Sequence, residues 1–145
     1  SLAGVTELAS HLSSTFLSDS NAVSRELKRK LIGDGEAAMR DLDQVSPLKH
    51  ADRVTVPLLI AHGGKDKRVL PSQSSRMVKA LEQSGKTVES IVFDYEGHGL
   101  SRPQNQLTFY TRLLSFFHRH LGGLPPAPAD APEPAAPASS TGPGG

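Results

Sequence analysis

The chain has 145 residues, and its 16 Lys and Arg against 15 Asp and Glu give a formal net charge of +1. Neither sign of charge gathers in a long run, so the basic surface of a nucleic-acid-binding protein is not expected. The absence of cysteine excludes disulfides and thiolate zinc sites. No apolar run approaches the length that a membrane-spanning helix requires, so no membrane partner is expected either.

The first half of the chain predicts helices and short turns. It opens with SLAGVTEL, residues 1–8, which is typical of the end of a strand that runs through a turn into a helix. Apolar residues four apart over residues 23–31 indicate another helix, which the glycines at 33 and 35 are expected to end. Ser46 and Pro47 then fit the cap and the first residue of a short helical turn.

Two strands alternate with two helices over the second half of the chain. The apolar run VPLLIA at residues 56–61 is continuous, which is typical of a strand covered on both faces. Residues 87–95 are rich in β-branched and aromatic residues and predict a second strand. Helices are expected between the strands, from about Pro71 to Ser84, and after them, from about Gln104 to Leu121. Apolar residues recur so densely in the last helix that we expect it to be substantially buried.

This order of elements predicts the α/β fold class, with a parallel βαβ unit. Two strands do not make a stable sheet, so the chain is expected to be one portion of a larger domain. We divide it into a folded part, residues 1–123, and a tail, residues 124–145. The tail is rich in proline and alanine and lacks aromatic and β-branched aliphatic residues, so it is expected to be disordered.

Both loops that follow the predicted strands carry a residue with catalytic chemistry. The first strand runs into HGGKDKRV, which contains Asp66, and the second runs into EGHG, which places His98 between two glycines. Catalytic groups of open parallel sheets lie just beyond the carboxyl ends of the strands. Adjacent strands are about 5 Å apart, so we expect a hydrogen bond between Asp66 and His98.

Such a pair supplies two members of a catalytic triad. A serine hydroxyl is a weak nucleophile until a neighbouring imidazole removes its proton. A carboxylate on the other ring nitrogen fixes the tautomer and stabilises the imidazolium that forms. In α/β-hydrolases the triad follows the chain order Ser, Asp, His, and Asp66 before His98 fits the last two positions.

Residues from about 46 to 123 resemble the C-terminal end of the prolyl oligopeptidase family of serine peptidases, in particular bacterial acylaminoacyl-peptidases and dipeptidyl peptidases. The segments that carry the resemblance are SPLKHADRV, PLLIAHGGKDKRV and DYEGHGLSRPQNQLTFYTRLLSFFHRHLGG, together with residues 1–7. The resemblance implies the C-terminal portion of an α/β-hydrolase fold, with Asp66 as the triad acid and His98 as the triad base. It also implies hydrolysis of short peptides without a metal or organic cofactor, and an N-terminal β-propeller outside this chain.

The main departure from the family pattern is that no G-x-S-x-G nucleophile motif occurs in the chain. The serine is therefore expected upstream of residue 1, in an N-terminal half with which this chain would form the site, and the chain alone is expected to be inactive. Two alternatives remain open. One is an esterase or dienelactone-type hydrolase with the same roles for Asp66 and His98, and the other is a noncatalytic α/β-hydrolase-like module.

Other polar residues near the two loops are expected to support the site rather than to react. His62, at the end of the first strand, is interpreted as a structural residue beneath the site. Arg102 and Asn105 are expected to hold the preceding loop by hydrogen bonds. Lys67 and Arg68 are interpreted as solvated side chains.

Overall fold

The computed structural model describes residues 1–18, 21–33 and 35–123. The tail and its predicted disorder lie outside the described residues. The elements follow in the order α1 (Leu8–Ser18), α2 (Ala22–Ile32), α3 (Gly35–Gln44), the 3-10 helix η1 (Pro47–Arg53), β1 (Leu58–Gly63), α4 (Ser72–Gln83), β2 (Val88–Phe93) and α5 (Pro103–Leu121).

The two strands pair in parallel, with Leu58 opposite Val88 and Gly63 opposite Phe93. The predicted parallel βαβ unit is thereby confirmed. β1 begins two residues later than predicted. Since proline has no N–H to donate, the ladder starts after Pro57, where the N–H of Leu58 donates to the carbonyl of Thr87 at 3.0 Å.

The start of the chain lies along the other edge of β1. Leu2 forms a parallel bridge with Ala61, where the N–H of Ala3 donates to the carbonyl of Ala61 at 2.9 Å. The N–H of Ala61 donates in turn to the carbonyl of Ser1 at 2.8 Å. Residues 1–8 therefore form the predicted strand end that leads into α1.

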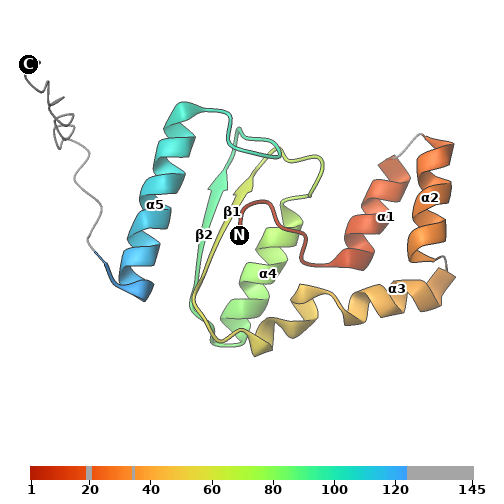
Figure 1. Ribbon diagram of the computed structural model, residues 1–145, viewed down its shortest axis with the longest axis horizontal. Coiled ribbons are helices and arrows are strands. Elements are labelled where there is room, and N and C mark those ends of the chain that lie inside the picture. The colour runs from red at the N-terminus through yellow and green to blue at the C-terminus, as the bar shows by residue number, and fades with distance from the viewer. Residues whose placement is uncertain (19–20, 34, 124–145) are drawn as a thin grey trace, which may run out of the picture.

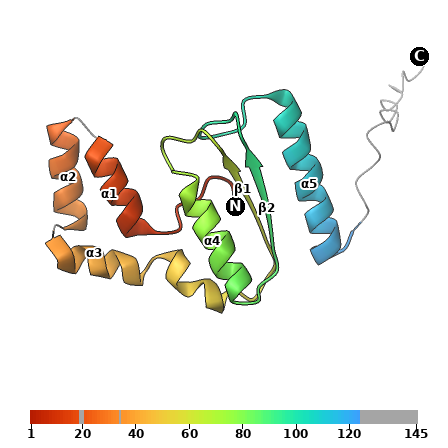
Figure 2. The same ribbon diagram turned by 180° about the vertical axis from the view of Figure 1, so that it is seen from behind.

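Helices α4 and α5 lie on opposite sides of the sheet (Figures 1 and 2). β1 is buried along almost its whole length, as its continuous apolar run predicts. The predicted helix between the strands is confirmed as α4, with Met77 and Leu81 facing the sheet. The buried core on this side consists of Ala51 of η1, Ile60, Met77 and Leu81.

The prediction that the last helix is substantially buried is wrong. Phe116 is the buried residue of α5, and Phe109 and Leu113 beside it are partly buried. The neighbouring stripe, at spacings of three and four, is exposed: Leu107, Tyr110, Leu114, Phe117 and Leu121. The helix is apolar on two adjoining faces, and the described chain covers one of them.

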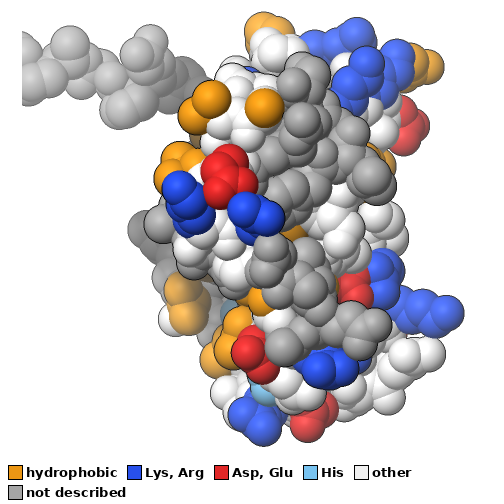
Figure 3. Space-filling model, turned by 90° about the vertical axis from the view of Figure 1, so that its right-hand side faces the viewer, with side chains coloured by type: hydrophobic (Ala, Val, Ile, Leu, Met, Phe, Trp, Pro, Cys, Tyr) orange, Lys and Arg blue, Asp and Glu red, His pale blue; other side chains and the backbone are white. Residues whose placement is uncertain are grey.

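The helix predicted around residues 23–31 is confirmed as α2. Gly33 ends it in the left-handed conformation, at φ 89°, and donates to the carbonyl of Arg29 at 2.8 Å. Gly35 was also predicted to end this helix. That prediction is wrong, because Gly35 begins α3. Helices α1 to α3 lie beyond α4, away from the sheet (Figure 1). Acidic and basic side chains are interspersed on this side of the molecule (Figure 3).

The predicted turn after Ser46 is confirmed as η1, but the predicted cap is wrong, since Ser46 makes no side-chain cap hydrogen bond to it. The Ser46 hydroxyl instead accepts the N–H of Leu8 and donates to the carbonyl of Leu42, both at 2.8 Å. It therefore joins the start of α1 to the end of α3.

Candidate active site

The two loops beyond the strands are packed backbone against backbone at Gly63. A Cβ at this position would lie 2.0 Å from the carbonyl oxygen of Gly97 and 2.6 Å from that of Glu96. The N–H of Lys65 donates to the same Glu96 carbonyl at 2.8 Å. Glycine at the end of β1 therefore brings the loop of Asp66 and the loop of His98 together.

The structure places the predicted Asp66–His98 pair in direct contact. His98 Nδ1 lies 2.8 Å from Asp66 Oδ2. Asp66 is 2 % exposed, and its other oxygen, Oδ1, accepts the N–H groups of Arg68 and Val69 at 2.8 and 3.0 Å. The carboxylate is thus fixed by its own loop on one side and presented to the imidazole on the other.

Opposing effects act on the pKa of Asp66. Burial raises it, because a charged carboxylate loses hydration. The N–H of Val69, the His98 ring and the N–H of Arg68 all stabilise the charged form, and together they hold the pKa below its ordinary value. The carboxylate is therefore ionised at neutral pH, as an acceptor for an imidazole must be.

The His98 ring points one nitrogen inward and leaves the other available. Since an ionised carboxylate can only accept, Nδ1 carries the proton, and Nε2 of the neutral ring then carries a lone pair. None of the described residues hydrogen-bonds to Nε2, and the side chain is 38 % exposed. His98 can accept a proton from a group on its exposed side while Asp66 stabilises the resulting cation.

Glu96 fastens the His98 loop from within. It is 1 % exposed. One oxygen accepts the N–H and hydroxyl of Ser101 at 2.9 and 2.7 Å, and the other accepts the N–H of Arg102 and the amide of Asn105 at 2.9 and 2.8 Å. The predicted role of Arg102 and Asn105 is confirmed, whereas Glu96 was not predicted.

These hydrogen bonds also determine the charge of Glu96. The N–H of Ser101, the amide of Asn105 and the Ser101 hydroxyl lower the pKa of Glu96 from 4.5 to about 2. The sequence offered one signal for this role, namely a carboxylate directly before the His98 loop with hydrogen-bond donors a few residues downstream.

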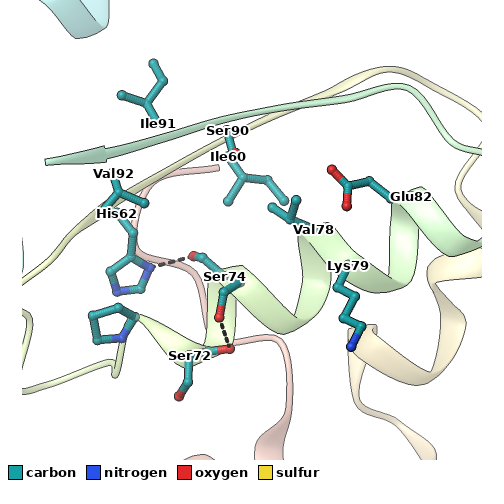
Figure 4. A pocket seen from close by; sticks show the side chains of 12 residues that line it. Ile60, His62, Ser72, Ser74, Val78, Lys79, Glu82, Ser90, Ile91 and Val92 are labelled. Atoms are coloured by element: carbon teal, nitrogen blue, oxygen red, sulfur yellow. Dashed lines mark hydrogen bonds between the residues drawn. The ribbon is translucent and has the colours of Figure 1, made fainter.

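His62 lies beneath the pair, as predicted, and is 1 % exposed. It also lines one end of a pocket of about 720 Å³ between α4 and β2 (Figure 4). Neither Asp66 nor His98 lines this pocket. Lys67 and Arg68 are exposed, as predicted.

Residues 1–18, 21–33 and 35–123 contain neither a candidate metal site nor a candidate membrane-spanning helix. No group of three or more His, Asp or Glu could hold a metal ion. None of the helices there is both long and apolar enough to cross a membrane.

The model of the prolyl oligopeptidase family matches residues 3–124. Dipeptidyl peptidase family member 6 of Caenorhabditis elegans is 36% identical over 97 residues, which are 65% of this chain and 13% of that protein. Dipeptidyl aminopeptidase BIII of Pseudoxanthomonas mexicana is 38% identical over 96 residues, or 65% of this chain and 14% of that protein. The chain therefore spans about an eighth of the length of these curated relatives.

Solved peptidase structures share the fold. An acylaminoacyl peptidase of Pyrococcus horikoshii superposes with a TM-score of 0.67 at 27% identity, covering 86% of this chain and 20% of that one. A puromycin-hydrolyzing peptidase of Mycobacterium tuberculosis gives a TM-score of 0.71 at 27% identity, covering 86% and 18%. The predicted α/β-hydrolase fold, present in part, is confirmed.

Proposed function

Because the chain belongs to the prolyl oligopeptidase family, we propose that the full-length protein containing it is a serine peptidase in which Asp66 and His98 are the triad acid and base. The observation that carries the proposal is the 2.8 Å contact between His98 Nδ1 and the buried carboxylate of Asp66, with Nε2 on the exposed side. This is the arrangement that a serine nucleophile requires of its base.

The reaction then follows from the two imidazole nitrogens. The hydroxyl oxygen of a serine from outside this chain attacks the carbonyl carbon of the scissile peptide bond, while His98 Nε2 takes the hydroxyl proton. The C–N bond breaks, and Nε2 returns that proton to the leaving amine. Water then attacks the acyl carbon while Nε2 takes a proton from it, the bond between the acyl carbon and the serine oxygen breaks, and Nε2 returns the proton to that oxygen. Asp66 stays ionised throughout and stabilises the imidazolium.

The proposed substrates are short peptides. Several relatives bear names that refer to the release of dipeptides or acylated amino acids. We further propose that the serine lies on a G-x-S-x-G turn encoded before Ser1, and that a β-propeller precedes it and admits only short peptides.

The proposal is tested on the full-length protein with a fluorophosphonate probe, which labels activated serines, and with peptide substrates. His98→Ala should abolish labelling. Asp66→Asn should lower kcat by up to about ten-thousand-fold with KM little changed, because the imidazole loses its correct tautomer. The exposed residues Asp52 and His120 provide matched controls as Asp52→Asn and His120→Ala.

An Asp66→Asn variant that kept more than about a tenth of wild-type activity would place the triad acid elsewhere. Rapid hydrolysis of simple esters with no hydrolysis of any peptide would instead support the esterase alternative.

A further inference from the structure

The Asp66 carboxylate lies between two imidazoles. Its Oδ2 is 2.8 Å from His98 Nδ1 and 3.3 Å from His62 Nε2. His98 is partly exposed and lies in the loop that follows β2, whereas His62 is buried near the end of β1. In the proposed reaction only the His98 ring transfers a proton, and His62 has no part in that step.

The hydrogen bonds of His62 determine its tautomer. Nε2 lies 2.8 Å from the carbonyl oxygen of Val69, and since a carbonyl can only accept, Nε2 carries the proton. Nδ1 lies 2.5 Å from the hydroxyl of Ser74, on the first turn of α4 (Figure 4). In the neutral ring, Nδ1 accepts a hydrogen bond from the Ser74 hydroxyl, and Nε2–H donates to the Val69 carbonyl, with Asp66 Oδ2 at 3.3 Å from the same nitrogen.

The backbone of Val69 connects the His62 side chain to the Asp66 carboxylate. The carbonyl of Val69 accepts from His62, while the N–H of the same residue donates to Asp66 Oδ1 at 3.0 Å. His62 therefore holds the Asp66 loop through Val69 and lies beside Oδ2, the oxygen that accepts from His98. Ser74 holds the His62 ring against α4. The Asp66 carboxylate is therefore positioned by its own loop, by His62 of β1 and, through the His62 ring, by α4.

We propose that His62 is a positioning residue for the triad acid. Its Nε2–H holds the Asp66 loop through the Val69 carbonyl, and its ring lies beside Oδ2, so that the orientation and tautomer of His98 are fixed, while the Ser74 hydroxyl holds the His62 ring in place. This inference rests on the proposed function, because it assigns His62 a role in the reaction that Asp66 and His98 would perform.

Two amide substitutions separate this role from simple filling of the core. The side-chain amide of glutamine reaches about as far as Nε2 of histidine, whereas that of asparagine reaches about as far as Nδ1. His62→Gln therefore retains a donor for the Val69 carbonyl, and His62→Asn removes it. Both variants lose the ring, so a role in packing alone predicts similar effects for the two.

The experiment compares kcat, KM and the fluorophosphonate labelling rate of these variants in the full-length protein. His62→Asn should lower kcat about 10- to 100-fold with KM within about twofold, as expected when a reacting group is misplaced by a fraction of an ångström. His62→Gln should stay within about threefold of wild type. Ser74→Ala, which leaves the ring in place, should lower kcat by only a few-fold, because Val69 still fixes the tautomer.

Thermal melting of each variant shows whether it folds. Equal losses of kcat in His62→Asn and His62→Gln would overturn the inference, and so would a His62→Asn variant that folds and keeps its kcat within about twofold. If His62→Asn fails to fold, the other two variants test the inference. It is contradicted if Ser74→Ala leaves kcat unchanged, or if His62→Gln lowers kcat as much as Asp66→Asn does. Full activity in Asp66→Asn and His98→Ala would instead show that the proposed function itself fails.

Discussion

The Glu96 side chain illustrates how a single buried charge can order a functional loop. Its two oxygens accept four hydrogen bonds from residues 101–105, which lie just beyond His98. Because these donors lower the pKa from 4.5 to about 2, the charged form is favoured by folding. The stabilisation is complete above about pH 4.5 and is lost as the pH falls toward 2.

Glu96→Gln should therefore destabilise the full-length protein at neutral pH, because a carboxamide has one acceptor oxygen for the four donors. The difference in melting temperature between variant and wild type should shrink as the pH is lowered from 4.5 toward 2, since Glu96 itself becomes neutral there. Melting curves at several pH values measure this, with the exposed Glu82→Gln on α4 as control. A difference that did not change with pH would mean that the Glu96 charge is not what holds the loop.

Asp66 and His98 could be predicted from the sequence because each follows a recognisable strand and their order matches a known triad. For Glu96 the sequence carries only a weak signal, the hydrogen-bond donors downstream of the carboxylate, and for the His62–Ser74 contact it carries none. The hydrogen bonds of both depend on how the loops and the first turn of α4 fold around them. The apolar patterns that identify strands carry no information about this local folding. Similarly, Gly97 and Gly99 look equivalent around His98 in the sequence, but only Gly99 has a positive φ, 151°.

At the scale of elements, the site depends on the close approach of the loops after β1 and β2. Gly63→Ala would place a Cβ 2.0 Å from one backbone carbonyl oxygen and 2.6 Å from another, and neither can move as a flexible side chain could. The loops must separate, which should break the Asp66–His98 contact and lower kcat at least about 100-fold.

Gly97→Ala is the matched control for Gly63→Ala. It lies in the same contact, but its Cβ would meet no atom within 4 Å, so we expect less than a threefold change in kcat. Both variants can be compared in the fluorophosphonate assay. Equal activity of Gly63→Ala and Gly97→Ala would contradict the requirement for close loop packing.

The elements themselves differ in how well the sequence predicts them. The strands, α4 and α5 were predicted within a few residues because their apolar patterns are strong. The burial of α5 was not, since periodicity identifies a helix but not how many of its apolar faces find a partner. The start of α3 at Gly35 was missed because two glycines two residues apart are equally compatible with the end of one helix and the start of the next.

At the scale of the whole molecule, the described residues leave much apolar surface uncovered. β2 is bonded to β1 alone within the described chain, and the α5 stripe from Leu107 to Leu121 is exposed. A two-stranded sheet is rarely stable by itself, and apolar surface of this extent usually lies against another part of a protein. The chain also spans only 13% of the Caenorhabditis elegans relative and 14% of the Pseudoxanthomonas mexicana relative.

We therefore expect the 145-residue chain, produced alone, to be both inert and incompletely packed. It should not react with a fluorophosphonate, because His98 Nε2 has no serine to activate, and it should bind a hydrophobic dye and unfold without a sharp transition. A longer protein that begins far enough upstream to include the proposed G-x-S-x-G turn should gain labelling and cooperative unfolding together, since the same added strands would carry the serine and cover the sheet. Stoichiometric labelling of a serine in the isolated chain would contradict the proposed upstream nucleophile. Sharp melting of the isolated chain as a soluble monomer would show that the α5 stripe and the free strand edge need no further cover.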